Sequence, residues 1–275
     1  MTWPPRPLLV GILNITEDSF SDGGRYLDPA TAIARARRLV AGGADIVELG
    51  AAASNVAAKA VPPEEEIRRL EPVVAALKRD RVPLSIDTFQ PETQHFALAR
   101  GVEYLNDIQG FPDPAIYSEL AVSSCRLVVM HAVQRRGRAR SLDLGPDEVW
   151  RHINGFFAER VPRLVQAGIA RERLILDPGM GLFLSSRPEA SLQVLRGLPE
   201  LKQAFGLPIL ISVSRKSFLA RLTGHDDPAA LGAATLAAEL YAARHGADLI
   251  RTHDPAALRD ALTVLEALEG VGQAS

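Results

Sequence analysis

The chain alternates short apolar runs with longer amphipathic segments, and this alternation repeats eight times. The runs are rich in Ile, Val and Leu and cover residues 8–14, 44–50, 82–88, 103–107, 126–131, 174–177, 208–213 and 248–251. Because most of these runs are continuously apolar, they predict strands that are covered on both faces, as in a parallel sheet. Strands and helices that alternate in this way indicate βαβ units.

The segments between the runs carry the helical period. They cover residues 30–41, 64–78, 91–100, 113–121, 146–168, 188–205, 228–246 and 255–269. Asp28 followed by Pro29 is typical of a helix start, with an N-cap and a first-turn proline. A (β/α)8 barrel typically needs about 250 residues, and the chain has 275. We therefore predict an α/β fold, a single (β/α)8 TIM barrel domain over residues 1–275 with short tails at 1–6 and 270–275.

Composition excludes several other classes of protein. The net charge is −2, which provides no general field for nucleic acid. The single cysteine, Cys125, cannot form an internal disulfide, and this fits a reducing compartment. The first nine residues are proline-rich and lack a signal-peptide core, and no run of about 18 apolar residues occurs. We expect a cytoplasmic protein that binds neither nucleic acid nor membranes.

Polar residues crowd the ends of the predicted strands, which is where barrel enzymes place their chemistry. These residues are Asn14, Asp87, Asn106, Asp107, His131, Asp177, the run Ser214-Arg215-Lys216-Ser217 and the run Arg251-Thr252-His253. A polar residue at a strand end is often only the N-cap of the next helix, and we favour that role for Asp107 and Asp254. His131 is equally well explained as a buried, hydrogen-bonded side chain. Convergence at seven strand ends still favours one site.

The side chains at these ends suggest two neighbouring subsites. Carboxylates, an amide and an amine match the ring nitrogens, amino group and carbonyl of a flat heterocycle such as a pterin. Asp87, Asn106, Asp177 and Lys216 provide that set. A second, more cationic patch suits a diphosphate, with an amide oxygen available to hydrated Mg²⁺. Its members are Asn14, Arg251 and His253.

With these motifs in order, the sequence resembles the dihydropteroate synthases over nearly its whole length. The matching stretches are residues 11–24, 43–46, 85–88, 106–107, 130–131, 177–181, 214–217 and 251–253. Residues 89–94, 104–113 and 183–185 resemble the mobile, sulfonamide-insensitive branch of that family. The resemblance implies condensation of 6-hydroxymethyl-7,8-dihydropterin diphosphate with 4-aminobenzoate, which yields 7,8-dihydropteroate and diphosphate with Mg²⁺ as cofactor.

The resemblance also implies a role for each matching residue. The implied catalytic residues are Asp87, Lys216, Arg251 and His253, and the implied pterin-binding residues are Asp87, Asn106, Asp177 and Lys216. The diphosphate would be bound by Asn14, Arg251 and His253, with Asn14 also the metal ligand. The 4-aminobenzoate would contact Ser217, Ser54, Phe20 and Leu182. Residues 18–24, which include Phe20 and Asp22, match the family's closing loop.

The chain departs from the family pattern after the second strand. Most members read Gly-Glu-Ser-Thr-Arg-Pro-Gly, whereas this chain reads Ala-Ala-Ala-Ser-Asn-Val-Ala over residues 51–57. Ser54 can replace the threonine hydroxyl, but Asn55 and Val56 stand where the arginine and proline would be. The lost positive charge is restored only if Lys59 reaches the site. Leu182 stands where many members have an aromatic residue. These changes fall in the 4-aminobenzoate pocket, so we expect weakened sulfonamide binding.

Two alternative functions remain at this stage. A non-catalytic pterin-binding paralogue would explain the altered loop after the second strand. A methyltetrahydrofolate methyltransferase-type barrel would share the pterin floor, but residues 214–217 and 251–253 favour the synthase. We also expect a homodimer, because the helix predicted over residues 228–246 has an alanine-rich face that can form a contact between two copies.

Overall fold

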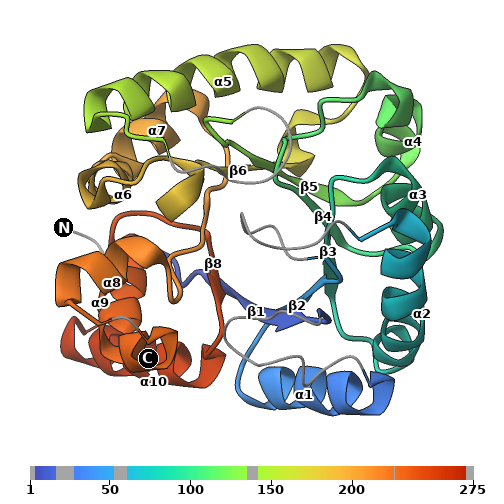
Figure 1. The fold of residues 1–275 in the computed structure, drawn as a ribbon, viewed down its shortest axis with the longest axis horizontal. Coiled ribbons are helices and arrows are strands. Elements are labelled where there is room, and N and C mark those ends of the chain that lie inside the picture. The colour runs from blue at the N-terminus through green and yellow to red at the C-terminus, as the bar shows by residue number, and fades with distance from the viewer. Residues whose placement is uncertain (1–3, 17–27, 53–60, 135–141, 226, 271–275) are drawn as a thin grey trace.

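The structure is a computed structural model that describes residues 4–16, 28–52, 61–134, 142–225 and 227–270. Eight parallel strands form the centre, and the helices surround them (Figure 1). The strands are β1 (Leu8–Asn14), β2 (Ile46–Gly50), β3 (Leu84–Asp87), β4 (Tyr104–Asp107), β5 (Arg126–Met130), β6 (Leu174–Asp177), β7 (Leu210–Ile211) and β8 (Leu249–Thr252). Their order in the sheet is β6-β5-β4-β3-β2-β1-β8-β7.

The two ends of this sheet meet, so the predicted TIM barrel is confirmed. Leu176 of β6 forms a parallel bridge with Ile209, just before β7. The backbone N–H of Leu176 donates to the carbonyl oxygen of Pro208 at 2.8 Å. Strand β7 is nevertheless much shorter than the predicted run of residues 208–213.

The helices follow the predicted segments, but one segment is divided, one helix was not predicted, and the segments 113–121 and 228–246 begin as 3-10 turns. They are α1 (Pro29–Ala41), α2 (Pro63–Arg79), α3 (Pro91–Ala99), α4 (Tyr117–Val122), α5 (Pro146–Gln166), α6 (Pro188–Arg196), α7 (Leu198–Phe205), α8 (Ser217–Thr223), α9 (Gly232–Arg244) and α10 (Pro255–Leu268). The predicted helix 188–205 is two helices, because Pro199 cannot continue a helix and Gly197 accommodates the Trp150 ring, which would collide with a Cβ. Helix α8 was not predicted, because its 7 residues are too few to display a helical period.

Alternate residues of each strand point into the barrel and fill it in layers. The lower layer is apolar and consists of Val10, Ile46, Val128, Ile175, Leu210 and Leu249. Two residues further along four of these strands stand Met130, Asp177, Ser212 and Arg251. Because residues two positions apart on a strand point to the same side, the inward-facing side chains change from apolar in the core to mostly polar at the mouth of the barrel. Among the described helices, none is long and apolar enough to span a membrane.

One buried carboxyl group lies behind the barrel wall. Glu239 of α9 is 2% exposed, and burial raises its pKa to about 8 although the Thr252 side chain hydrogen-bonds to it. Its Oε1 atom has no hydrogen-bond partner among the described residues. The carboxyl group is therefore protonated in the folded protein at neutral pH.

We expect Glu239→Gln to flatten the pH dependence of stability. The folded pKa of about 8 lies above the ordinary value of 4.5, so this group stabilises the fold fully below about pH 4.5. That contribution is lost as pH rises through 8. Between pH 6 and pH 9 the parent chain should lose about 1–3 kcal/mol more unfolding free energy than the variant. Urea unfolding at both pH values measures this, and identical pH dependences would contradict it.

Candidate active site

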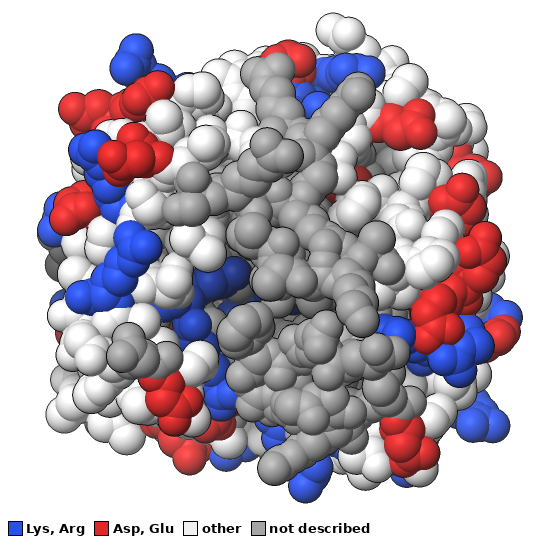
Figure 2. Space-filling view, in the orientation of Figure 1, with Lys and Arg blue, Asp and Glu red and all other residues white. Residues whose placement is uncertain are grey.

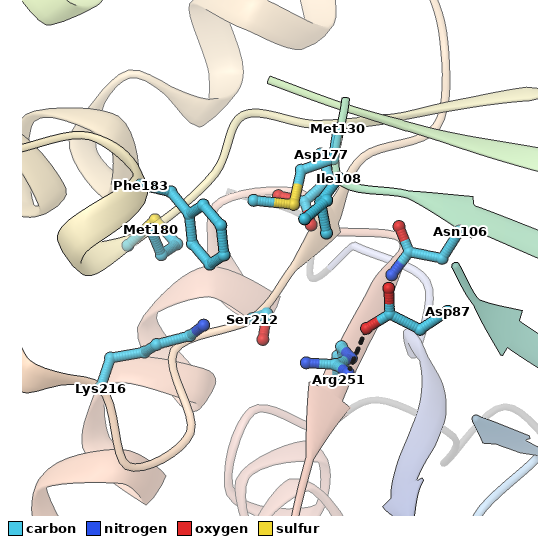
Figure 3. Close-up of a pocket in the computed structure, with 10 residues that line it drawn as sticks. All are labelled: Asp87, Asn106, Ile108, Met130, Asp177, Met180, Phe183, Ser212, Lys216 and Arg251. Carbon is cyan, nitrogen blue, oxygen red and sulfur yellow. Dashed lines mark hydrogen bonds and ion pairs between the residues drawn. The ribbon is translucent and has the colours of Figure 1, made fainter. Parts of the chain in front are cut away.

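A cavity opens at the carboxyl ends of the strands, and ten side chains from six strand ends and their loops line it (Figure 3). The lining residues are Asp87, Asn106, Ile108, Met130, Asp177, Met180, Phe183, Ser212, Lys216 and Arg251. All four residues that we assigned to the heterocycle from the sequence are therefore brought together in one cavity, beside Arg251.

Arg251 lies across the cavity between two carboxylates. Its Nη2 atom donates to Asp87 Oδ2 at 3.1 Å, and its Nε atom donates to Glu48 Oε1. Burial, followed by the nearby negative charge of Glu48, raises the pKa of Asp87 to about 7. Asp87 therefore sits close to its titration point at neutral pH, and the guanidinium favours its charged form.

Asp177 is placed by the tight turn that follows β6. Its Oδ1 atom accepts the backbone N–H of Gly179 at 2.8 Å. Gly179 has φ of +77°, and a Cβ there would collide with the carbonyl oxygen of His131, so the turn requires glycine. Burial raises the pKa of Asp177 to about 6. Asp177 lines the cavity, so its carboxylate can meet a ligand there.

Lys216 approaches from the opposite side, between β7 and α8. Its Nζ atom lies 5.3 Å from the centre of the Phe183 ring. Burial, followed by the charge of Arg251, lowers the pKa of Lys216 to about 8. The cavity thus holds two carboxyl groups with raised pKa values and an amine with a lowered one, as is common at functional sites.

His253 stands among cationic side chains at the end of β8. Burial and then Arg215, Arg251, Lys216 and Arg35 lower the pKa of His253 to about 3. The Ser214 hydroxyl lies 2.9 Å from His253 Nδ1 and accepts the His253 backbone N–H at 3.2 Å. Figure 2 shows basic side chains gathered in the hollow left of centre, with both signs mixed around the rim. We counted His253 in a cationic patch from the sequence, but its ring is neutral in the free site.

Three strand-end residues have structural roles, as the sequence favoured for Asp107 and Asp254 and allowed for His131, although Asp107 holds a turn and does not cap the next helix. Asp107 accepts the backbone N–H groups of Gln109 at 2.7 Å and Phe111 at 3.1 Å, so it holds the turn after β4. His131 is buried, with Nδ1 3.0 Å from the carbonyl oxygen of Pro178. Asp254 caps α10 by accepting the backbone N–H of Ala257 at 3.1 Å.

The remaining predicted residues lie around the cavity or outside the described chain. Asn14 is half-buried at the end of β1 beside Gly50. Ser217 begins α8, and its Oγ atom lies 3.6 Å from the position that a Cβ of Gly181 would take. Leu182 is half-buried, and its neighbour Phe183, rather than Leu182 itself, lines the cavity. Phe20, Asp22, Ser54, Asn55, Val56 and Lys59 lie outside the residues that the structure describes.

Sequence reasoning missed two polar residues of the site. Glu48 is 1% exposed in the middle of β2 and pairs with Arg251. Ser212 lines the cavity, and its buried hydroxyl has no hydrogen-bond partner within the described part of the chain. Both stand at inward positions, so the period of two along the strands could have identified them.

Comparison with known proteins places this site in a family. The sequence matches the family described as "Pterin binding enzyme" over residues 10–253. It is 57% identical to dihydropteroate synthase type-2 from Escherichia coli over 262 residues, which cover 95% of this chain and 96% of that protein. The chain belongs to the dihydropteroate synthase family.

Two solved structures of the family carry informative ligands. A Xanthomonas albilineans dihydropteroate synthase with 4-aminobenzoic acid has a TM-score of 0.87 and 39% identity, covering 97% of this chain and 94% of that one. The same bacterium's dihydropteroate synthase in complex with 7,8-dihydropteroate has a TM-score of 0.83 and 38% identity, covering 98% and 96%. The similarity thus extends over nearly the whole chain.

Proposed function

We propose that the chain condenses 6-hydroxymethyl-7,8-dihydropterin diphosphate with 4-aminobenzoate to give 7,8-dihydropteroate and diphosphate. The observation that carries this proposal is the cavity itself. It combines the buried acceptors Asn106 and Asp177 and the half-buried acceptor Asp87 with the donor Lys216, and cationic side chains lie directly beside it. Ligands bound in solved structures of the family agree with this chemistry: one structure holds 4-aminobenzoic acid, a substrate of the proposed reaction, and another holds 7,8-dihydropteroate, its product.

The polar groups of the cavity suit the edge of a dihydropterin. Ionised Asp177 and the Asn106 amide accept hydrogen bonds from ring N–H and amino groups, and Lys216 donates to a carbonyl or ring nitrogen. Ser212 adds a hydroxyl that can do either. Ile108 and Met180 provide apolar contacts for the ring. An analogue that lacks one of these groups leaves a buried polar atom unpaired, and this gives strong discrimination.

Cationic side chains beside the cavity suit the negative charge of the leaving diphosphate. Arg251 provides a guanidinium, and Arg35 Nη2 donates to the carbonyl oxygen of His253 at 3.3 Å, so a second guanidinium stands nearby. Because the Ser214 hydroxyl can donate to His253 Nδ1, the ring proton is left on Nε2, where it can donate to a phosphate oxygen. These groups stabilise the negative charge that develops as the carbon–oxygen bond breaks.

Mg²⁺ is the cofactor that we propose. The ion commonly takes one or two protein oxygens, substrate phosphate oxygens and water. Asn14 provides one such amide oxygen at the carboxyl end of β1, beside Gly50 of β2. No group of three or more His, Cys, Asp or Glu suited to a metal occurs in the described chain. When bound, the ion would neutralise charge on the diphosphate.

The chemistry is a substitution at the pterin methylene carbon. The carbon–oxygen bond breaks first, and its electron pair leaves with the diphosphate. The resulting cation is delocalised into the ring, where the charges of Asp87 and Asp177 stabilise it. The amine of 4-aminobenzoate then donates its lone pair to the methylene carbon and loses a proton. The chain's own residues contribute mainly positioning and electrostatic stabilisation.

Ligand binding and product formation distinguish this proposal from the two alternatives. In a synthase, diphosphate and a pterin together should tighten binding of 4-aminobenzoate, and calorimetry with and without diphosphate measures this. A methyltransferase-type barrel would show no diphosphate effect. A non-catalytic paralogue would bind the dihydropterin diphosphate but form no dihydropteroate.

The pH dependence of kcat/KM should be bell-shaped. Asp87 and Asp177 present a full negative charge to the dihydropterin only when ionised, and their pKa values are about 7 and about 6, so activity should fall below about pH 7. Lys216 carries its positive charge only when protonated, and its pKa of about 8 places the basic limb above that pH. Steady-state rates from about pH 5.5 to about pH 9.5 bracket both limbs. A profile that stays flat over that range would contradict the assigned roles.

We further propose that the enzyme is insensitive to sulfonamides. Support comes from the altered residues 51–57 and from Phe183, which enters the cavity next to Lys216. Sulfonamides compete for the 4-aminobenzoate pocket, so a reshaped wall can exclude the larger drug and retain the substrate. The inhibition constant of sulfamethoxazole should exceed that of an ordinary family member at least tenfold. An unchanged constant would remove this proposal.

A homodimer is the assembly that we propose. Residues of α6, α8 and α9 form an apolar groove on the outside of the barrel, where Leu222 is 51% and Tyr241 38% exposed. A second copy of the chain would cover these side chains. Sedimentation equilibrium should give twice the chain mass, and Leu222→Asp should shift it toward the monomer. A monomeric parent protein at micromolar concentration would contradict this.

A further inference from the structure

Glu48 lies below the cavity floor and accepts hydrogen bonds from three neighbours. Its side chain is fully buried. Oε1 accepts from Arg251 Nε, whereas Oε2 accepts from Ser85 Oγ at 2.9 Å and from Asn106 Nδ2 at 3.2 Å. A carboxylate can only accept, so every one of these contacts fixes the direction of its donor.

The contact with Asn106 has a consequence for ligand recognition. Because the Asn106 amide group must turn its NH2 toward Glu48, its carbonyl oxygen is directed elsewhere. That oxygen, Oδ1, is buried and has no hydrogen-bond partner in the described part of the protein, and Asn106 lines the cavity (Figure 3). A buried carbonyl is costly to leave unpaired, so the site is completed by a ligand N–H donor at this point.

We propose that Glu48 is a positioning residue that sets the hydrogen-bonding polarity of Asn106 and aims the guanidinium of Arg251. The proposal rests on the function proposed above and deepens it. With Nε held by Glu48 and Nη2 held by Asp87, Arg251 stays across the cavity mouth. With NH2 held, Asn106 presents an acceptor and selects a ring in the tautomer that carries N–H at that edge.

The substitution Glu48→Gln tests this polarity. Glutamine has a single acceptor oxygen, and when that oxygen serves Arg251 its NH2 faces Asn106. Asn106 must then rotate and direct its own NH2 into the cavity, against the donors of the ligand. We expect 6-hydroxymethyl-7,8-dihydropterin, which lacks diphosphate, to bind about 10²-fold more weakly by calorimetry. The Michaelis constant for the second substrate, 4-aminobenzoate, should stay within twofold. General destabilisation of the fold would not weaken pterin binding while leaving this constant unchanged.

The double variant E48Q/N106D provides the decisive comparison. The glutamine introduced by E48Q would donate to the new carboxylate at position 106, whose second oxygen again presents an acceptor to the ligand. Pterin affinity should recover at least tenfold relative to E48Q, whereas N106D alone places two buried carboxylates together and should bind weakly. Glu239→Gln is the matched control, a buried glutamate outside the cavity, and should leave pterin affinity within twofold.

Outcomes separate this inference from the proposed function. Normal pterin binding by E48Q, or a folded double variant no better than E48Q, would overturn the positioning role and leave the function intact. Absence of pterin binding by the parent chain would overturn the function.

If E48Q fails to fold, nitrogen-15 spectra of asparagine-labelled parent protein test the positioning role of Glu48 instead. The Asn106 NH2 protons, identified by their loss in N106D, should exchange slowly without ligand, and exchange as fast as in exposed amides would overturn the role.

Discussion

Replacement of Arg251 by methionine should lower kcat/KM for the dihydropterin diphosphate about 10³-fold. The change removes the guanidinium beside the leaving group, and loss of one charge-stabilising donor typically costs about 10²–10³-fold. It also leaves the buried Glu48 and the half-buried Asp87 without their shared cation. The pKa of Asp87 should rise further, so its carboxyl group would be neutral at pH 7. Steady-state kinetics with coupled detection of diphosphate measures the loss.

A surface arginine provides the control for this variant. Arg37 pairs with Asp80 at 2.8 Å on the outside of the barrel, where the Arg37 side chain is 59% exposed. Arg37→Met should leave kcat/KM within twofold, since exposed ion pairs contribute little. If Arg251→Met retained more than a tenth of the parent activity, Arg251 would not be the residue that stabilises the departing diphosphate.

Replacement of Asp177 by asparagine should weaken pterin binding and lower kcat/KM by about 10²–10³-fold. Asparagine can keep the contact with the Gly179 N–H through its carbonyl oxygen, so the turn after β6 should survive. Its NH2 would then face the cavity, where the ligand also presents donors, and the unmet partners oppose binding. The charge that stabilises the pterin cation is lost as well. Calorimetry and steady-state kinetics separate these two effects.

Asp45 is the matched control for Asp177, because it also holds a backbone N–H next to a strand. Its Oδ2 atom accepts the Leu9 N–H at 2.7 Å, beside the start of β2 at the opposite end of the barrel from the cavity. Asp45→Asn should leave pterin affinity within twofold. Equal losses in the two variants would show that the Asp177 effect comes from weakened folding rather than from recognition.

The main features of the cavity could be predicted from sequence, because one rule places them. In a parallel barrel, polar residues at the carboxyl end of an apolar run lie at the mouth. This rule alone identifies Asp87, Asn106 and Asp177, and the structure brings them into one cavity. The same rule cannot separate a ligand-binding residue from a turn-holding one. Asp107 satisfied it equally well, yet it holds the backbone of its own loop.

Other features escaped because they depend on partners that are distant in sequence. Glu48 is part of an apolar run, and its role becomes clear only when Arg251, 203 residues away, is placed against it. The raised and lowered pKa values depend on burial, which no motif reports. The break between α6 and α7 follows from Gly197 and Pro199. The apolar residues keep the helical period across this point, but the backbone cannot continue as one helix.

Release of diphosphate from purified protein, followed together with dihydropteroate, tests the central claim most directly. The protein would be given dihydropterin diphosphate and Mg²⁺, with and without 4-aminobenzoate. We expect turnover that depends on 4-aminobenzoate and yields one dihydropteroate for each diphosphate. Tight binding of the pterin diphosphate without any turnover would contradict a synthase and indicate a pterin-binding protein that lacks catalysis.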